Sequence, residues 1–321
     1  MAKMASGKTV LITGGEGRLG RALTHRLAEK GFKVKVLIRS REKAHMLQQG
    51  VVPYVGDICS EREVRQACSG ADAVYHLAAV VSQYKASGAE IHRVNVEGTT
   101  NVVEACGNEG IKRLIFSSSI DVYGIRRHGV LNENALPMPT DVYGRSKYNA
   151  ENIIRHSGID HTIFRIASIY GKGFEESFFK LFKLIRDGRA YIIGSGKNRM
   201  ALIHVSDVVS ALALASVKKH RSSVYNLGDG KVYTQEGLMD LAAGLLGVER
   251  PGRHISEFIA KVFAKKRGMN TDELRFLTSD RAIDISLVKR ELGFRPVVRI
   301  NEGGRELVGM FMRMDKPPER R

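Results

Sequence analysis

Residues 9–20 read T-V-L-I-T-G-G-E-G-R-L-G, and this stretch determines the expected fold. Residues 10–12 are apolar, as in a strand that is buried on both faces of a parallel sheet. Glycines follow at positions 14, 17 and 20, and leucines recur every four residues at 19, 23 and 27, which predicts one face of a helix. A strand, a glycine turn and a helix in this order are typical of a dinucleotide-binding site.

Each glycine has its own expected role in that site. Gly14 lets the chain reverse tightly, Gly17 lets backbone N–H groups approach a pyrophosphate, and Gly20 lets the helix close onto the strand. The start of the helix, with Arg18 and Leu19, then presents unpaired N–H groups and a partial positive charge to the anion. A surface turn that is glycine-rich by chance is the alternative, and the flanking apolar pattern argues against it.

Length and composition are those of a globular enzyme. The chain has 321 residues, of which 43% are hydrophobic, enough for a large core and one or two domains. It contains no run of 18 apolar residues, and residues 1–8 lack an apolar secretory segment. Cys59, Cys68 and Cys106 form no C-x-x-C pattern and are expected to be ordinary thiols, outside any disulfide or zinc site. We therefore expect a cytoplasmic protein without a metal site.

The net charge of +17 raises the question of nucleic-acid binding. The basic residues are spread along the sequence, however, and only residues 265–267 and 320–321 form clusters. No RNA- or DNA-binding signature accompanies them, so nucleic acid is not the expected main partner. A general positive potential also suits an enzyme whose cofactor carries phosphates.

The second predicted strand, Lys33 to Ile38, ends where a dinucleotide fold meets the adenosine ribose. A carboxylate there accepts a hydrogen bond from the 2′-hydroxyl, whereas arginine binds a 2′-phosphate. The sequence offers Arg39, Arg41 and Lys43, so NADP is favoured over NAD as the cofactor. Glu16 in the glycine loop could lie near the same phosphate and weakens that preference. A solvated start of the helix expected to reach residue 49 is the alternative for Arg41 and Lys43.

Two further strand ends supply candidate cofactor contacts. After a third predicted strand at residues 51–55, Asp57 could accept from the adenine amino group while Ile58 packs on the ring. Asp57 could equally cap the helix expected from about residue 60. A fourth strand at residues 73–77 is followed by two alanines, which permit close passage of the cofactor. We interpret His76 as a packed structural histidine.

The first half of the chain alternates strands and helices. A helical segment at residues 89–110 precedes a fifth strand at 113–116, which ends in Ser117, Ser118 and Ser119. This alternation is typical of a doubly wound α/β sheet, a Rossmann fold, with ligands at the carboxyl ends of its strands.

Tyr143 and Lys147 are four residues apart at the start of a predicted helix, so both side chains share one face. An ammonium near a tyrosine favours the phenolate, and we expect Lys147 to lower the pKa of Tyr143. Tyr143 could then exchange a proton with a substrate oxygen as hydride passes to or from a nicotinamide. Ser119 at the preceding strand end could bind the same oxygen, and Lys147 could also reach the nicotinamide ribose.

These motifs together resemble the extended short-chain dehydrogenases/reductases, the group of NAD-dependent sugar epimerases, dehydratases and related reductases. The resemblance covers nearly the whole chain and rests on T-G-G-E-G-R-L-G (13–20), G-D-I (56–58), H-L-A-A (76–79), N-V-E-G-T (95–99), F-S-S-S-I-D-V-Y-G (116–124), Y-G-R-S-K (143–147), R-I-A-S-I-Y-G (165–171), I-H-V-S-D-V (203–208) and L-G-F-R-P (292–296). It implies a catalytic triad of Ser119, Tyr143 and Lys147, with Asn95 supporting the active-site network. The expected cofactor contacts are Gly14, Gly17, Arg18, Leu19, Arg39, Asp57, Ile58, Leu77, Ala78, Ala79, Asn95, Ser117, Tyr143, Lys147, Ile166 and Ser168.

The resemblance also implies a division of the chain. Residues 1–171 would form the dinucleotide-binding domain, to which the chain returns at about residues 200–230. Residues 172–199 and 231–321 would form a smaller substrate-binding lobe. A homodimer formed through helices that flank the sheet is implied as well.

Departures from the family pattern leave the substrate open. Nucleotide-sugar epimerases often carry an asparagine that contacts the diphosphate where this chain has Ser168, and the Asp-Glu pair of sugar dehydratases is Ile120-Asp121 here. Asp121 alone could still act as an acid. An arginine after the second strand, here Arg39, resembles the pattern in the NADP-dependent dihydroflavonol and hydroxysteroid-type reductases of the same superfamily. We expect hydride transfer at a secondary alcohol or ketone of a nucleotide sugar. The alternatives are an NADP-dependent reductase of a non-nucleotide ketone and a non-catalytic NADP-binding sensor.

Residues 255–267 combine an apolar face at helical spacing with a basic face. We expect a helix of the substrate lobe that packs inward. Contact with a membrane surface or a lipid substrate is the alternative.

Overall fold

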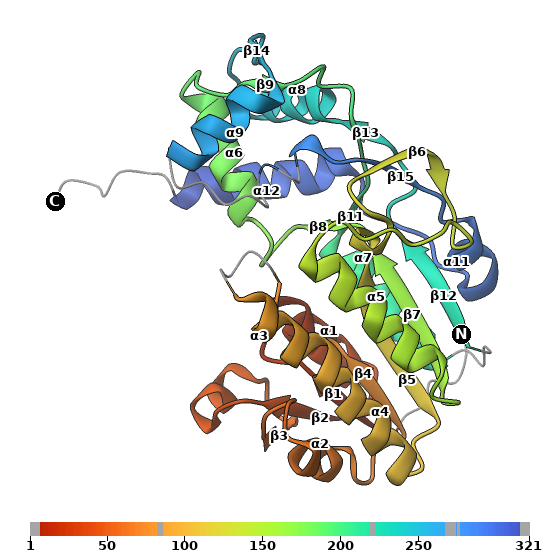
Figure 1. The fold of residues 1–321 in the computed structure, drawn as a ribbon. Helices are drawn as coiled ribbons and strands as arrows, with labels where there is room; N and C mark the ends of the chain where they lie inside the picture. The colour runs from red at the N-terminus through yellow and green to blue at the C-terminus, as the bar shows by residue number, and fades with distance from the viewer. Residues whose placement is uncertain (1–6, 82–85, 218–221, 267–273, 275–276, 315–321) are drawn as a thin grey trace, which may run out of the picture.

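The computed structural model describes residues 7–81, 86–217, 222–266, 274 and 277–314 of the chain. A parallel sheet of seven strands forms its centre, in the order β12-β7-β5-β4-β1-β2-β3 (Figure 1). The chain begins inside this sheet, builds outward to β3 and then returns to build the other half, so the predicted doubly wound fold is confirmed. The strands are β1 (Thr9–Thr13), β2 (Lys33–Ile38), β3 (Val52–Val55), β4 (Ala73–His76), β5 (Arg113–Ser119), β7 (Asp160–Ile166) and β12 (Ser223–Leu227).

Helices cover both faces of the sheet, because each strand presents alternate side chains to opposite faces. Val10 and Ile12 of β1 lie in one core cluster with Leu23 and Leu27 of α1, whereas Leu11 lies in the other. The first face carries α1 (Arg18–Glu29) and α7 (Val205–Val217). The second face carries α2 (Glu61–Cys68), α4 (Gly98–Asn108) and α5 (Val142–Arg155).

Two local elements differ from the sequence-based expectations. The helix predicted to reach residue 49 is a short 3₁₀ helix, η1 (Arg41–Met46), since Gly50 with its φ of 87° turns the chain into β3. The helix predicted over residues 89–110 is not regular. It starts as α3 (Gly88–His92), passes through a π-helical turn at Arg93–Glu97 and continues as α4.

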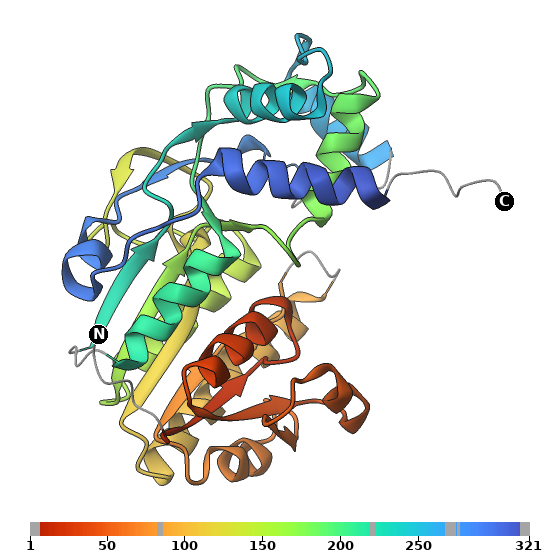
Figure 2. The same ribbon diagram turned by 180° about the vertical axis from the view of Figure 1, so that it is seen from behind.

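A smaller lobe lies beyond the carboxyl ends of the strands (Figures 1 and 2). Its core forms around Phe182, Met239 and Phe311, which come from three helices: α6 (Glu176–Arg186), α8 (Gln235–Leu246) and α12 (Ile300–Met314). Two-stranded pairs complete the structure: β6 (Arg126–Leu131) with β15 (Asp280–Ile283), β8 (Ser168–Tyr170) with β11 (Leu202–His204), β9 (Ile192–Ile193) with β14 (His254–Ile255), and β10 (Arg199–Met200) with β13 (Tyr233–Thr234).

Two helices in the segment predicted for the lobe have unexpected surroundings. α11 (Ser286–Leu292) packs Val288 and Leu292 into the core of the sheet, so the chain returns to the sheet once more near its end. α9 (Glu257–Lys266) was expected to pack its apolar face inward, and this expectation is wrong. It buries Ala260 but leaves Phe258 77% exposed, since the lobe core is already filled by α6, α8 and α12.

Candidate active site

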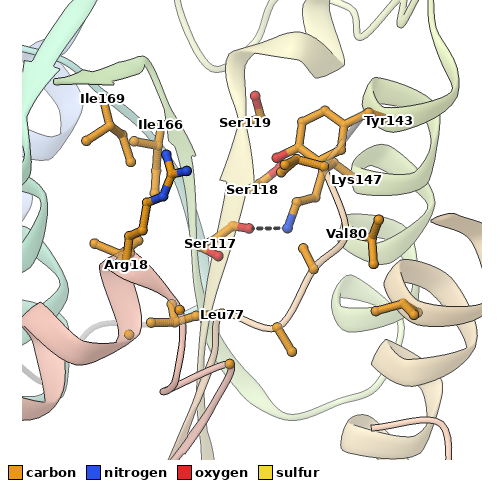
Figure 3. A pocket seen from close by; sticks show the side chains of 18 of the residues that line it. Arg18, Leu77, Val80, Ser117, Ser118, Ser119, Tyr143, Lys147, Ile166 and Ile169 are labelled. Carbon is orange, nitrogen blue, oxygen red and sulfur yellow. Dashed lines mark hydrogen bonds between the residues drawn. The ribbon is translucent and has the colours of Figure 1, made fainter. Parts of the chain in front are cut away.

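A cleft of about 830 Å³ runs along the carboxyl ends of the strands, and the glycine loop and Tyr143 both line it. Every residue predicted for the site lines this cleft except Asn95 and Arg41, one of the three cations offered for a 2′-phosphate. Figure 3 shows Arg18 at the start of α1 on one side of the cleft, beside Ile166 and Ile169, and Tyr143 and Lys147 on the other. Segments that are far apart in sequence therefore meet at one sheet edge, as a doubly wound topology requires.

The three glycines of the loop stand where a side chain would crowd the neighbouring backbone. Gly14 has a φ of 71°, and a Cβ there would lie 2.6 Å from the backbone nitrogen of Ala78. A Cβ on Gly20 would lie 2.2 Å from the carbonyl oxygen of Gly14, and one on Gly17 would lie 3.1 Å from the same atom. The backbone of Gly17 also donates to that carbonyl at 3.0 Å, which fixes the turn. The loop thus brings bare backbone to the cleft, as close approach of a pyrophosphate demands.

The N-terminus of α1 opens toward the same cleft. Its N-cap residue, Gly17, makes no side-chain cap, and the first turn contains no acidic residue. The unpaired N–H groups and the positive end of the helix dipole therefore favour an anion. Arg18 lines the cleft and pairs with Glu176 of α6 at 3.3 Å, which ties the loop to the lobe. These features fit the diphosphate of a dinucleotide.

Glu16 is the centre of a small charge cluster at the end of the cleft where the adenosine ribose is predicted to lie. Its Oε1 lies 3.2 Å from Nε of Arg39 and 3.0 Å from Nζ of Lys43, and its other oxygen accepts from the Arg39 backbone. Burial opposes ionisation, but the hydrogen bonds from Lys43 and Arg39 hold the pKa of Glu16 below its usual value. Two of the three cations offered for a 2′-phosphate, Arg39 and Lys43, are thus already paired with one carboxylate.

The other residues predicted to contact the adenosine part of the cofactor lie on the turn after β3 and on the loop after β4. Asp57 accepts from the backbone of Cys59 at 2.9 Å, and Ser60 is the N-cap of α2, so Asp57 closes a turn and does not cap the helix. Ile58 is buried beside it and lines the cleft. Leu77, Ala78 and Ala79 form the cleft wall after β4.

His76 is a structural residue, as expected. Its Nδ1 lies 2.8 Å from the hydroxyl of Thr13 and its Nε2 lies 2.9 Å from that of Thr99, while the ring stacks on Phe116. Burial, together with the positive charge of Lys147, lowers the pKa of His76 to about 3. The ring is therefore neutral and joins strand β1 to helix α4.

Asn95 is the predicted contact that does not reach the cleft. Its side chain is buried, donates to the carbonyl of Val80 at 2.9 Å and accepts from the backbone of Val80 at 2.7 Å. It also donates to the hydroxyl of Ser146 at 2.9 Å. Asn95 therefore joins the loop after β4 to α5.

The predicted catalytic side chains converge from β5 and α5. Asp141 caps α5 by accepting from Gly144 at 2.8 Å, which sets the first turn that carries Tyr143. The hydroxyl of Ser119 lies within hydrogen-bonding reach of Tyr143, and Nζ of Lys147 donates to the carbonyl of Ser117 at 2.7 Å (Figure 3). Nζ of Lys147 lies 6.0 Å from the centre of the Tyr143 ring.

The expectation that Lys147 lowers the pKa of Tyr143 is wrong for this arrangement. Burial, followed by the carboxylates of Asp121 and Asp141, raises the pKa of Tyr143, and the hydrogen bond with Ser119 only partly offsets this. Burial also lowers the pKa of Lys147 to about 7, although the charge of Glu151 acts in the opposite direction. The protein alone therefore keeps Tyr143 as a neutral phenol, a proton donor.

A buried ion pair holds α5 against the sheet. Arg165 of β7 donates through Nη2 to Glu151 at 2.7 Å and through Nε at 3.0 Å, and both side chains are almost fully buried. The hydroxyl of Ser118 adds a bond to Glu151 at 2.6 Å, and Nη1 of Arg165 donates to Tyr123 at 2.9 Å. Glu151 lies one helical turn after Lys147, so the network fixes the helix that carries the predicted catalytic pair.

Sequence reasoning missed Arg281, which lies on β15 and lines the cleft beside Asp121. Its side chain is only 8% exposed, its Nη1 donates to Asp121 at 2.6 Å, and its Nε has no hydrogen-bond partner. The second oxygen of Asp121 accepts from Ser119 at 3.2 Å. Asp121 is therefore held as an acceptor on both sides, which argues against the general-acid role considered for it. No local motif pointed to Arg281, because only the pairing of β15 with β6 brings it here.

The remaining predicted contacts form the wall opposite Tyr143. Ile166, at the end of β7, is buried, and Ser168 opens β8, and both line the cleft. Within the described ranges, no cluster of three or more His, Cys, Asp or Glu side chains could hold a metal ion. In the same part of the chain, no helix is both long and apolar enough to cross a membrane.

Comparisons with known proteins agree with this fold. The profile of the NAD dependent epimerase/dehydratase family matches residues 10–228. The chain is 30% identical to 3beta-hydroxysteroid-dehydrogenase/decarboxylase isoform 1 of Arabidopsis thaliana, over 94% of this chain and 79% of that protein. It is 29% identical to UDP-glucose 4-epimerase of Vibrio cholerae, over 95% and 96% of the two chains. The solved structure of MoeE5 in complex with UDP-glucose and NAD superposes with a TM-score of 0.76 at 27% identity, over 95% of this chain and 99% of that one.

Proposed function

Because the chain belongs to the NAD dependent epimerase/dehydratase family, we propose that it transfers hydride between NAD(P) and a secondary alcohol or ketone of its substrate. The observation that carries this proposal is that Ser119, Tyr143 and Lys147 line the same cleft as the glycine loop. The bound nicotinamide supplies or accepts the hydride. The chain supplies the groups that bind the substrate oxygen and move its proton.

Each of the three side chains has a proposed role. Tyr143 exchanges a proton with the reacting oxygen, and its raised pKa favours the donor role that reduction of a ketone needs. Ser119, which shares a hydrogen bond with Tyr143, binds the same oxygen. Lys147 would hold the nicotinamide ribose. Asn95 and Glu151 position these groups through the loop after β4 and through α5.

The proposed cofactor preference is for NADP, with NAD as a weaker ligand. Arg39 and Lys43 supply two positive charges against the single carboxylate of Glu16, so a net positive charge remains for a 2′-phosphate. The related solved structure holds NAD, which makes the ratio of the two affinities the quantity to measure. We expect NADPH to bind more tightly than NADH in fluorescence titrations, and Arg39→Ala to abolish the difference. Equal affinities in the unmodified protein would exclude the preference.

A nucleotide sugar is the proposed substrate. Two relatives are named for UDP-glucose, either as a substrate or as a bound ligand. Arg281 supports an anionic substrate, since a nearly buried guanidinium with an unpartnered Nε lines the cleft next to Asp121 and Ser119. One of the diphosphate oxygens would satisfy that nitrogen.

A non-nucleotide ketone, such as a steroid-like compound, is the second candidate. The relative from Arabidopsis thaliana named for a 3beta-hydroxysteroid supports it. So does Ser168, which occupies the position where nucleotide-sugar epimerases often have asparagine. The third alternative, a non-catalytic NADP sensor, has less support because the Ser, Tyr and Lys side chains are all present. The division into a dinucleotide-binding domain and a lobe, a homodimer and a cytoplasmic location stay predictions.

Thermal unfolding in the presence of nucleotides separates the two substrate candidates. A ligand that binds only the native state raises Tm, so we expect UDP, or one of GDP, dTDP and CDP, to raise it further in protein saturated with NADPH. Arg281→Gln should lose most of that increase, whereas Arg281→Lys should keep part of it. If no nucleotide raises Tm, a nucleotide sugar is excluded and a 3β-hydroxysteroid becomes the next substrate to assay.

The proposed chemistry is tested with Tyr143→Phe. This variant should bind NADPH as tightly as the unmodified protein and lose turnover of the identified substrate by about 10²–10⁴-fold. Retained turnover would exclude the proton-transfer role of Tyr143. Failure to bind either NADPH or NADH would exclude the proposed function itself.

A further inference from the structure

Helix α9 presents an apolar face to solvent. In a helix with about 3.6 residues per turn, positions 258, 259, 262 and 263 share one arc of the surface, and position 260 lies on the other side. Ala260 is buried and packs with Ile193 and Leu274 of the lobe. The side chains on the outward arc are Phe258 (77% exposed), Ile259 (43%), Val262 (39%) and Phe263 (42%).

This face differs from the ordinary scatter of exposed apolar residues. Among the described residues, the other large exposed apolar side chains occur singly, such as Val297, or two within six positions, such as Leu136 and Met138, whereas four occur within the six positions 258–263. Single exposed apolar residues need no explanation, but a contiguous patch indicates a surface that is covered in use.

The position of α9 makes the patch accessible. The helix lies on the outer side of the lobe, away from the seven-stranded sheet (Figures 1 and 2). Both views place its C-terminal end on the same side of the lobe as the end of α12, where Met312 and Met314 are 49% and 74% exposed. None of these residues lines the catalytic cleft.

The charges around this face select the kind of partner. The sequence of α9 contains Lys261, Lys265 and Lys266 against a single acid, Glu257, and Arg267 follows directly. Lys261 is exposed beside the apolar arc. The whole chain carries a net charge of +17, so a second copy would bring two basic helices together and be repelled. These charges favour an anionic partner.

We propose that α9 docks on an anionic membrane surface. A basic helix with phenylalanines on its outward arc is the kind of helix that lies in the interface plane, with its apolar face at the boundary between headgroups and acyl chains. The side chain of Lys261, at the flank of the arc, reaches back to lipid phosphates. Phe258, the most exposed side chain of the arc, inserts, and Lys261 contacts the phosphates. The surface is convex, and a fluid interface accommodates a convex helix without a preformed groove.

A single tryptophan provides a direct test. The chain contains no tryptophan, so Phe258→Trp introduces the only indole and places it at the most exposed position of the patch. We expect its emission to move to shorter wavelength with vesicles of phosphatidylcholine and phosphatidylglycerol, and not with phosphatidylcholine alone. Val297→Trp is the matched control, since Val297 is also 77% exposed but lies outside α9, and its emission should not change.

Cosedimentation with the same vesicles measures the fraction of protein that is bound to the membrane. Phe258→Asp and Lys261→Glu should each lower the bound fraction about tenfold, and Val297→Asp should leave it unchanged. Binding should weaken at about 1 M salt, where the screening length falls to about 3 Å.

Three outcomes would overturn the proposal. The first is no spectral shift of Phe258→Trp with anionic vesicles, and the second is an equal shift of Val297→Trp. The third is a dimer in gel filtration that Phe258→Asp dissociates, because the patch would then belong to an interface between two copies. Cofactor binding should be the same in every variant, which separates this test from that of the proposed function.

Discussion

Removing the charge of Glu16 should tighten the binding of NADPH selectively. Glu16→Gln keeps the shape of the side chain but eliminates the carboxylate that lies 3.2 Å from Arg39 and 3.0 Å from Lys43. A 2′-phosphate bound to either cation at about 3 Å would have an oxygen within about 6 Å of that carboxylate. The carboxylate and the phosphate then repel each other, and the carboxylate also competes for the two cations.

Coulomb's law gives the size of the effect. Two unit charges about 6 Å apart interact by about 0.7 kcal/mol in water and by about 3 kcal/mol at an effective dielectric constant of about 20. A phosphate monoester carries about 1.5–2 negative charges, so the repulsion amounts to about 1–5 kcal/mol. The side chain of Arg39 is 70% exposed, which favours the lower end of this range. We therefore expect NADPH to bind about tenfold more tightly to Glu16→Gln.

Fluorescence titration with NADPH and NADH measures this prediction. The Kd for NADH should change by less than about twofold, because its ribose carries a neutral 2′-hydroxyl. The gain for NADPH should shrink between about 0.1 M and about 1 M salt, as the screening length falls from about 10 Å to about 3 Å. Glu42→Gln makes the same charge change in the neighbouring η1 segment, outside the cleft, and should alter neither Kd by more than about twofold. An equal gain for both cofactors, or none for NADPH, would refute the reasoning.

Three further predictions concern the residues that position the site. Arg165→Met removes the nearer cation from the buried Glu151, whose other cation, Arg155, lies 4.0 Å away. This variant should lower the free energy of unfolding by about 3–5 kcal/mol in urea titrations, while the double variant Arg165→Met/Glu151→Met regains most of it. A loss below about 1 kcal/mol would contradict the assigned burial. Burial lowers the folded-state pKa of Lys147 from 10.5 to about 7, so the folded protein binds this proton less tightly than the unfolded chain does. Burying the charged lysine therefore lowers the free energy of unfolding by its full amount below pH 7, and this loss of stability fades as the pH rises toward 10.5. Lys147→Met should therefore be more stable than the unmodified protein at pH 7, with a difference that narrows by pH 10 in denaturant titrations; a constant difference would contradict the shift. Asn95→Ala removes both bonds to Val80 and should weaken NADPH binding and lower the free energy of unfolding by about 1–3 kcal/mol, and an unchanged Kd would show that the loop after β4 does not depend on Asn95.

The fold could be predicted because its signals are local. The apolar run before Gly14 and the four-residue leucine repeat after it depend only on neighbours in sequence, and the buried strand and the helix face follow from them. The same holds for the pair Tyr143 and Lys147, whose spacing fixes a common helix face.

The electrostatics of the site could not be predicted in this way. The pKa of Tyr143 depends on carboxylates brought close by the caps of α5 and η4 (Ile120–Tyr123), and on where Lys147 finds its acceptor. Arg281 contacts Asp121 across 160 positions of sequence, through a strand pair that no periodicity reveals. Asn95 stood in a recognisable motif, but the π-helical turn that buries it is invisible in the sequence pattern.

The two ends of the cleft have different origins in the chain. The glycine loop, Asp57 and the residues after β4 follow the first strands of the sheet, whereas Arg281 lies on β15, in the last quarter of the sequence. Under the proposed function, a chimaera that exchanges only β15 and the surrounding lobe should alter which substrates are accepted and leave the preference between NADPH and NADH unchanged. New substrate specificities can therefore evolve in the lobe and β15 without changes in the strands proposed to bind the cofactor.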